Sequence, residues 1–184
     1  TLLDRNLQIF EGAFRGLNQE GIYYDDNIQR LVQNYRSAYI QLALSWQEAG
    51  NSPASLAVLQ RMDTYLPESI VQPMSVQMSL QLGVLFHDLG DPEGLERRLL
   101  SLVKREDVSF NDRFALATAW IDPLGDVQRG YDLLQPMAEE DKSGEVRFEL
   151  ALILDEQGEL ELALEEARRY CLDHPDKSDG VQLM

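Results

Sequence analysis

The sequence has few residues of the kinds that build disulfides, metal sites or cofactor sites. Its 184 residues include one cysteine and two histidines. Cys171 can form no disulfide within the chain, and at a helical core spacing it is expected to be a small buried hydrophobe rather than a nucleophile. His87 and His174 lie far apart in sequence, and neither belongs to an HExxH motif or a Cys/His metal spacing. We therefore expect neither a metal site nor a cofactor.

Positive charge is the second deficit. The chain has 16 Lys and Arg against 32 Asp and Glu, which gives a net charge of −16. Even the basic pairs Arg97-Arg98 and Arg168-Arg169 sit among glutamates, whereas binding to a phosphate backbone needs clustered basic residues. We therefore expect no nucleic-acid partner and no direct binding to an anionic membrane. An acidic surface of this kind is expected to be solvated, and adaptation to salt would also produce it.

Long apolar runs and catalytic motifs are also missing. No apolar run approaches the roughly 20 residues that span a membrane, and no charged-then-apolar signal peptide opens the chain. The sequence contains no GxxxxGK[ST] loop, no GxGxxG turn and no GxSxG elbow. Carboxylates are so numerous that no one pair of them indicates glycosidase chemistry. We expect a chain without catalytic residues, that is, not an enzyme.

What is present is a helical hairpin between Asn34 and Ser69, where two amphipathic segments flank a tight turn. Gly50 can end the first helix in the left-handed conformation that only glycine adopts cheaply. Ser52 can cap the second helix, and Pro53 can take its first position. Together with a hydrophobic fraction of 44%, this pattern indicates an all-α protein with a real core.

The first helix of this hairpin is expected to begin well before Asn34. From Asp25 or Asp26, each a natural N-cap, the apolar residues keep an i, i+3, i+4 rhythm as far as Trp46. This rhythm predicts one helix of roughly 24 residues, about two turns longer than a helix of a standard helical repeat.

The overhanging half of that helix needs a cover, because an unpaired apolar stripe would be an exposed patch. We expect aromatic side chains of residues 1–24 to pack on it around Ile28, Leu31 and Tyr35. These aromatic residues are Phe10, Phe14, Tyr23 and Tyr24.

The hairpin recurs along the chain. Gly50 is echoed by Gly90, Gly125 and Gly158, at spacings of 40, 35 and 33 residues, and each is followed by Asn, Asp or Glu. Four units in one period indicate a helical repeat. The expected units are about 36–69, 76–109, 111–143 and 144–177, in a repeat domain over 26–177 that follows a cap segment (1–25) and precedes a tail (178–184).

Prolines punctuate the later units. Asp91-Pro92 repeats the cap-then-proline start of a second helix. Pro73 lies in extra residues between the first two units, which either lengthen the linker or add a turn to the next helix. Pro123 should shorten the first helix of the third unit, because proline lacks the backbone donor that a helix needs.

Residues 35–177 resemble tetratricopeptide repeats, and the first hairpin matches their pattern most fully. That pattern of about 34 residues reads W-x2-L-G-x2-Y, then A-x3-F and a closing P. Only Met62 departs from the expected residue class. The pattern positions are Tyr39, Leu42, Ala43, Trp46, Ser55, Leu59, Met62 and Pro67. The resemblance implies a right-handed solenoid of about four hairpins, with seven to ten helices and no sheet beyond an incidental pair of strands. It also implies a non-catalytic scaffold that binds a peptide or a partner helix in a concave groove.

Residues 14–43 carry a second resemblance. They are similar to the segment after the last membrane span in a family of bacterial multi-spanning proteins related to protein O-mannosyltransferases. The residues that carry it are Phe14, Arg15, Leu17, Tyr24, Asp25, Arg30, Tyr35 and Arg36. This resemblance implies an accessory C-terminal domain of a membrane-embedded glycosyltransferase-like protein, on the periplasmic or extracytoplasmic side, and it carries over no catalytic residue. Otherwise a cytoplasmic location is expected, so the location stays open.

The tetratricopeptide register implies which side chains line the groove, since the second, fifth, ninth and twelfth residues of each first helix face the concave side. The apolar floor would be Ile40, Leu44, Leu80, Val84, Ala115, Ala119, Phe148 and Leu152. The edge would be Gln47, Glu48, His87, Asp88, Asp122, Asp155 and Glu156. It lacks the Lys, Asn and Arg of carboxylate-clamp repeats, so a terminal carboxylate would be desolvated without a cation.

The groove is therefore expected to bind a protein or peptide with an apolar anchor and basic flanks. Two other occupants stay open: the chain's own N-terminal segment, or a second copy of the chain in a homodimer.

Overall fold

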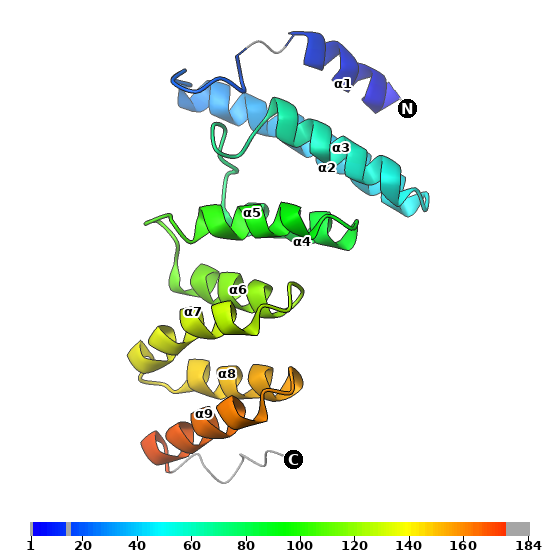
Figure 1. Cartoon of the computed structure of the whole chain (residues 1–184). Coiled ribbons are helices and arrows are strands. Elements are labelled where there is room, and N and C mark those ends of the chain that lie inside the picture. The colour runs from blue at the N-terminus through cyan, green and yellow to red at the C-terminus, as the bar shows by residue number, and fades with distance from the viewer. Residues whose placement is uncertain (1, 14–15, 176–184) are drawn as a thin grey trace. The chain divides into compact units, whose positions relative to one another are not determined.

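The computed structural model describes residues 2–13 and 16–175, apart from the side chain of Asp26. These residues form nine α-helices and no strand (Figure 1). The prediction of an all-α protein with seven to ten helices and no sheet is thus confirmed for the described part of the chain. The chain divides into two compact units, Thr1–Arg105 and Glu106–Met184.

Unit 1 contains one leading helix and two helical hairpins. The helices pack as α2 on α3 and α4 on α5, and α1 packs on α2. Their bounds are Leu2–Ala13 (α1), Asp26–Glu48 (α2), Ser52–Tyr65 (α3), Val76–Asp88 (α4) and Pro92–Leu102 (α5). The length of α2 agrees with the prediction. Its N-cap is Asp25, one of the two predicted candidates, whose side chain accepts hydrogen bonds from the backbone N–H groups of Asn27 and Ile28.

Unit 2 contains two further hairpins. Helix α6 packs on α7 and α8 packs on α9, while α7 also packs on α8. The bounds are Phe110–Ile121 (α6), Val127–Glu140 (α7), Glu145–Glu156 (α8) and Leu160–Asp173 (α9). All four hairpins join consecutive helices, as the recurring glycine turns predict.

The turn chemistry differs from prediction at one cap. Gly50 has a φ of 74°, as a left-handed helix end requires. The N-cap of α3 is Asn51, whose side chain accepts a hydrogen bond from Ala54 N, so the prediction that Ser52 caps this helix was wrong. The helix thus begins one residue earlier than predicted: Ser52 is its first residue, and Pro53, predicted to be the first, is the second.

The prolines act largely as expected. Asp91 caps α5 and Pro92 is its first residue. Helix α6 ends at Ile121, just before the Asp122-Pro123 bond. Pro73 lies in the linker between α3 and α4, because α4 begins at Val76. Of the two alternatives for the extra residues, the longer linker is therefore the one realised.

Small residues lie where the paired helices of the first three hairpins cross. In the first hairpin the Ser55 hydroxyl donates a hydrogen bond of 2.7 Å to the carbonyl of Ala43. In the second hairpin a Cβ on Gly83 would lie 2.6 Å from Leu95 Cδ1. In the third, a Cβ on Gly130 would lie 2.7 Å from the carbonyl oxygen of Ala117. The crossing at Gly130 is therefore too tight for a larger side chain, because the nearest backbone atom belongs to the facing helix.

The leading segment covers α2 only in part. The rings of Phe10 and Tyr35 lie 3.9 Å apart between centroids, so this predicted contact is confirmed. Tyr23 is 87% exposed, and the prediction that it packs on α2 was wrong. Ile28 and Leu31 stay 42% and 54% exposed. Phe14 lies outside the described residues.

Polar contacts fasten α1 to the first hairpin. The Glu11 carboxylate accepts a hydrogen bond of 2.8 Å from the Tyr39 hydroxyl and one of 2.7 Å from Arg61 Nη2. Arg61 Nη1 also lies 3.1 Å from Asp4 Oδ1. Leu7 of α1 is buried in the core that the first hairpin shares with α4. The helix α1 is thus an integral part of unit 1.

Deleting residues 1–24 should therefore lower the melting temperature or cause association. The deletion uncovers Tyr35 and leaves the Tyr39 hydroxyl and the Arg61 guanidinium without their carboxylate partners. Differential scanning calorimetry and light scattering would measure both effects. A monomeric truncation with an unchanged melting temperature would contradict this prediction.

Candidate functional site

A cleft lies between α2 and α4 in unit 1. Its volume is about 360 Å³. Its lining residues come from one face of each helix: Ile40, Leu44, Met78, Gln81, Leu82, Val84, Leu85 and Asp88. The two helices run in the same direction (Figure 1), so their C-terminal turns lie at the same end of the cleft.

The cleft brings together four residues that the repeat register predicts for the groove: Ile40, Leu44, Val84 and Asp88. Leu44 and Val84 are 41% and 36% exposed, so each presents apolar surface. Leu80 is only 5% exposed and does not line the cleft, so it offers little surface to a ligand.

The register overlooked several lining residues of α4, namely Met78, Gln81, Leu82 and Leu85. Met78, Gln81 and Leu85 are spaced i, i+3 and i+7, which places them on one helical face. That spacing is a signal that could have identified them from the sequence.

The C-terminal end of the cleft is acidic. Asp88 is exposed and lines the cleft, and its Oδ1 lies 3.5 Å from Nδ1 of the neighbouring His87. Glu48 and Gln47 are exposed in the last turn of α2, and Glu48 follows Leu44 by one helical turn. The eight residues that line the cleft include no Lys or Arg.

The remaining predicted groove residues lie in unit 2. Ala119 is buried, and Ala115 and Asp155 are partly buried. Phe148 packs against Tyr170, with ring centroids 5.4 Å apart. Leu152 is 36% exposed. The exposed carboxylates are those of Asp122 and Glu156. All residues that line the cleft between α2 and α4 belong to unit 1.

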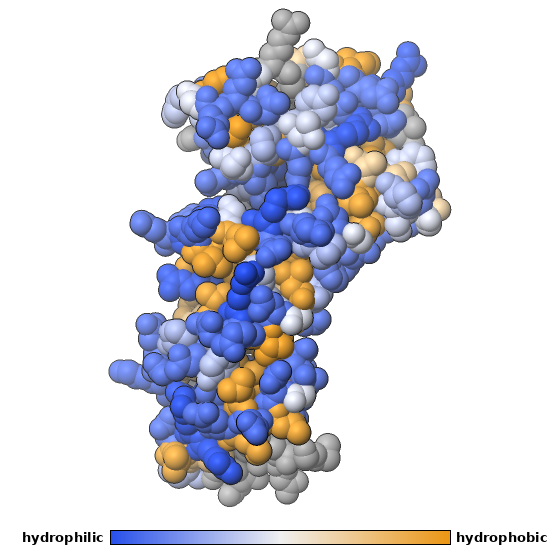
Figure 2. All heavy atoms as spheres, in the orientation of Figure 1, coloured by the Kyte–Doolittle hydropathy of each residue, from blue (hydrophilic) through white to orange (hydrophobic). Residues whose placement is uncertain are grey.

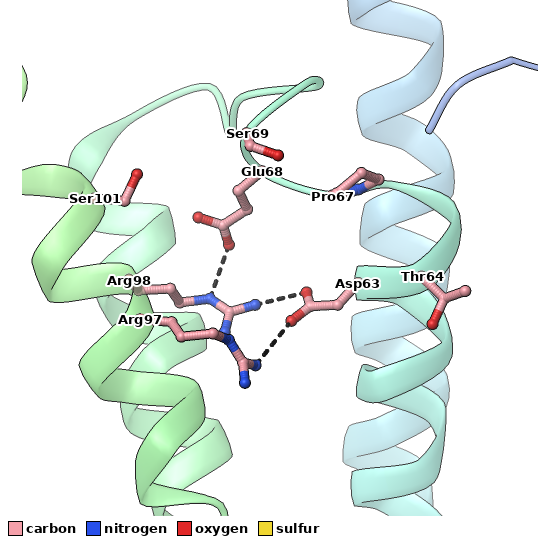
Figure 3. Close-up of a pocket in the computed structure, with 8 residues that line it drawn as sticks. All are labelled: Asp63, Thr64, Pro67, Glu68, Ser69, Arg97, Arg98 and Ser101. Atoms are coloured by element: carbon pink, nitrogen blue, oxygen red, sulfur yellow. Dashed lines mark hydrogen bonds and ion pairs between the residues drawn. The ribbon is translucent and has the colours of Figure 1, made fainter. Parts of the chain in front are cut away.

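A second cleft, of about 370 Å³, lies between the end of α3, the following linker and α5 (Figure 3). Arg98 occupies its wall. The guanidinium donates to Asp63 Oδ1 at 2.6 Å, to Glu68 Oε1 at 2.8 Å and to the Gly94 carbonyl at 2.9 Å. It also stacks over the Phe86 ring, 4.3 Å from the centroid.

These charged groups satisfy one another. The second oxygen of Glu68 accepts from the Ser79 hydroxyl, and Asp63 Oδ2 faces Arg97 at 3.7 Å. Burial raises the pKa of the Asp63 carboxyl, while Arg98 opposes that shift. The cleft is thus walled by a network that joins the linker to α4 and α5, and a structural role accounts for it.

Arg36 also binds the linker that follows α3. The side chain is fully buried and donates to the carbonyls of Leu66, at 3.1 Å, and of Val71, at 2.5 Å, and to Gln33 Oε1 at 2.6 Å. Its Nε is buried without a hydrogen-bond partner. Burial lowers the pKa of this guanidinium. Arg36 therefore stabilises the linker conformation at the cost of a buried charge.

Unit 2 has a buried ion pair of its own. Arg147 Nη1 lies 2.8 Å from Glu166 Oε2, and the Glu166 side chain is fully buried. The other oxygen of Glu166 accepts from the Tyr131 hydroxyl at 3.0 Å and from Arg169 at 3.3 Å. Burial and the contact with Glu166 raise the pKa of Tyr131 to about 12. This pair joins α8 to α9 and, through Tyr131, to α7.

The rest of the surface bears on whether the chain has a metal site or a membrane span. Hydrophilic side chains cover most of the face shown in Figure 2, with apolar side chains in separate places between them. Among the described residues, no His, Cys, Asp and Glu side chains gather in a group that could hold a metal ion. Within the same ranges, no helix is both long enough and apolar enough to cross a membrane.

Comparison with known proteins identifies no relative. No protein-family model matches the chain, and neither a curated protein nor a solved structure matches it significantly. The chain is an all-helical protein whose helices pack in consecutive pairs, and the cleft between α2 and α4 is its candidate functional site.

Proposed function

We propose that the chain is a protein-binding module and that the cleft between α2 and α4 receives an apolar anchor of a peptide or partner helix. The observation that carries this proposal is the combination of two partly exposed apolar side chains, Leu44 and Val84, with a carboxylate, Asp88, in one cleft. Small concave sites with an apolar lining and a few polar groups are the usual form of binding sites.

The charge of the cleft indicates the chemistry of the partner. Glu48 and Asp88 favour Lys or Arg next to the apolar anchor, and the net charge of −16 favours a basic partner at longer range. The apolar contacts would supply most of the affinity. Charges at the rim would act mainly on the association rate and its salt dependence.

We also propose that the four hairpins are tetratricopeptide-like and stack as a right-handed solenoid. Two observations support this proposal. The glycine turns recur at spacings of 40, 35 and 33 residues, close to a repeat of about 34 residues, and small residues lie where the paired helices of the first three hairpins cross. Small-angle X-ray scattering on the whole chain would test it. A scattering profile that no regular stack of hairpins can reproduce would contradict it.

Selection from a displayed random-peptide library would test the binding function. The wild-type chain should select peptides with an apolar residue flanked by Lys or Arg. Leu44→Asp should weaken the binding of the selected peptides by about 2 kcal/mol, or about thirtyfold in Kd, because it places a charge where the apolar anchor binds. Asp88→Asn should weaken them only a few-fold and flatten their salt dependence.

Leu100→Asp is the matched control. Leu100 is 43% exposed on α5 and does not line the cleft, so this variant should bind as the wild type does. Circular dichroism should show both leucine variants folded. If Leu100→Asp loses the peptides while Leu44→Asp retains them, the binding surface lies on the second helices. If the wild type selects no peptide, the proposed function fails.

A further inference from the structure

The charge of the cleft changes from one end to the other. At the C-terminal end of α2 and α4 stand Glu48 and Asp88, with His87 beside Asp88. Toward the N-terminal ends, the lining consists of Ile40, Met78 and the uncharged Gln81. The negative charge is therefore confined to one end of an otherwise apolar and uncharged cleft.

The helix dipoles reinforce this asymmetry. The C-terminal end of a helix carries about half a negative elementary charge, and cations stabilise it. Helix α2 has no basic residue in its last turn and carries Glu48 there. Helix α4 also ends in a carboxylate, Asp88, although its last turn contains His87 as well. These carboxylates oppose the stability of their own helices, and they add to the dipole field at the same end of the cleft.

We propose that the partner in this cleft is an amphipathic helix that lies antiparallel to α2 and α4, with basic residues in its first turn beside Glu48 and Asp88. This inference rests on the proposed function and adds the conformation, the polarity and the charge pattern of the ligand. A helix directs the positive end of its dipole toward the carboxylates only in this orientation. Lys or Arg in its first turn then adds a direct charge contact.

A helix also suits the walls of the cleft. No strand, and hence no open sheet edge, occurs among the described residues, so the pairing of backbones that holds an extended peptide has no template there. Two helices running side by side present a groove that accepts apolar residues spaced i, i+4 and i+7. On the bound helix these residues would meet Leu44 and Val84 first, then Ile40 and Met78.

Two synthetic peptides of opposite polarity test the inference. Both carry the same apolar residues at i, i+4 and i+7, the same staple on the solvent face, an acetylated N-terminus and an amidated C-terminus. One has Lys and Arg in its first turn and Gln in its last turn, and the other has the reverse. The first should bind the wild-type chain about tenfold more tightly, and the difference should shrink with added salt.

A charge-reversed double variant, Glu48→Lys with Asp88→Lys, should abolish or invert that preference. Glu93→Lys, a charge reversal at an exposed residue of α5, is the control and should leave it unchanged. A spin label on the N-terminal residue of the first peptide should broaden the methyl signals of Leu44 and Val84 more than that of Met78.

The outcomes separate the two proposals. The proposed bound helix and its polarity are overturned if the two peptides bind equally well or in the opposite order. They are also overturned if both peptides fail to bind while the library yields binders. In each of these cases the proposed binding function still stands. Library peptides that stay extended when bound would likewise contradict the proposed bound helix but not the binding function. A wild-type chain that binds neither the library nor the synthetic peptides overturns both proposals.

Discussion

Glu166→Ala is expected to lower the free energy of unfolding by about 3–5 kcal/mol, the usual cost of breaking a buried ion pair by removing one partner. The substitution leaves Arg147, itself nearly buried, without its 2.8 Å carboxylate contact, and it removes the acceptor of the Tyr131 hydroxyl. Urea unfolding followed by circular dichroism would measure the loss.

The neighbouring Glu165 provides the matched control. Glu165 pairs with Arg169 on the surface, where both side chains are about half exposed. Glu165→Ala should cost less than about 1 kcal/mol, because exposed pairs contribute little. Replacing both buried partners, as in Arg147→Met with Glu166→Leu, should recover much of the loss. Similar losses for Glu165→Ala and Glu166→Ala would show that burial does not decide the effect.

Gly130→Ala is expected to destabilise the chain by about 1–3 kcal/mol, as overpacking of a tight contact does. A Cβ at this position would lie 2.7 Å from the carbonyl oxygen of Ala117 and equally close to Ile121 Cδ1, so α6 and α7 would have to move apart. This cost opposes the gain of about 1 kcal/mol in helix propensity that alanine brings. Thermal and urea unfolding would measure the net effect.

Gly12→Ala is the control for that propensity gain. Gly12 lies in α1, and a Cβ there would meet nothing within 4 Å. This variant should be stabilised by up to about 1 kcal/mol, in the opposite direction to Gly130→Ala. If Gly130→Ala were also stabilising, the helices of the third hairpin could not be as closely packed as described.

The hairpins were predictable because their signals are local. Gly50 and the Asp91-Pro92 pair determine a helix end or start through backbone conformations that a few adjacent residues decide. The long α2 was predictable for the same reason, since its apolar rhythm and its N-cap at Asp25 lie within the helix itself. The N-cap of α3 was predicted at Ser52 and lies at Asn51. Such local sequence signals locate a helix end to within about one residue.

The candidate site was predictable in part. The repeat register placed Leu44, Val84 and Asp88 on one side, and the structure brings them into one cleft. It placed Leu80 there too, since Leu80 and Val84 share a helical face, yet one is 5% and the other 36% exposed. A register assigns a face to each residue, but the packing of neighbouring elements decides how much of that face reaches solvent.

The sequence by itself determined that this protein is helical, where its turns fall and that its surface is acidic, because each property depends on composition or on residues close together in the chain. Only the tertiary structure decided that Arg36 and Glu166 are buried, that α1 is fastened through Glu11 and Arg61, and that α2 and α4 enclose a cleft. These features join residues far apart in sequence. Their free energies depend on desolvation and on partners that no local pattern specifies.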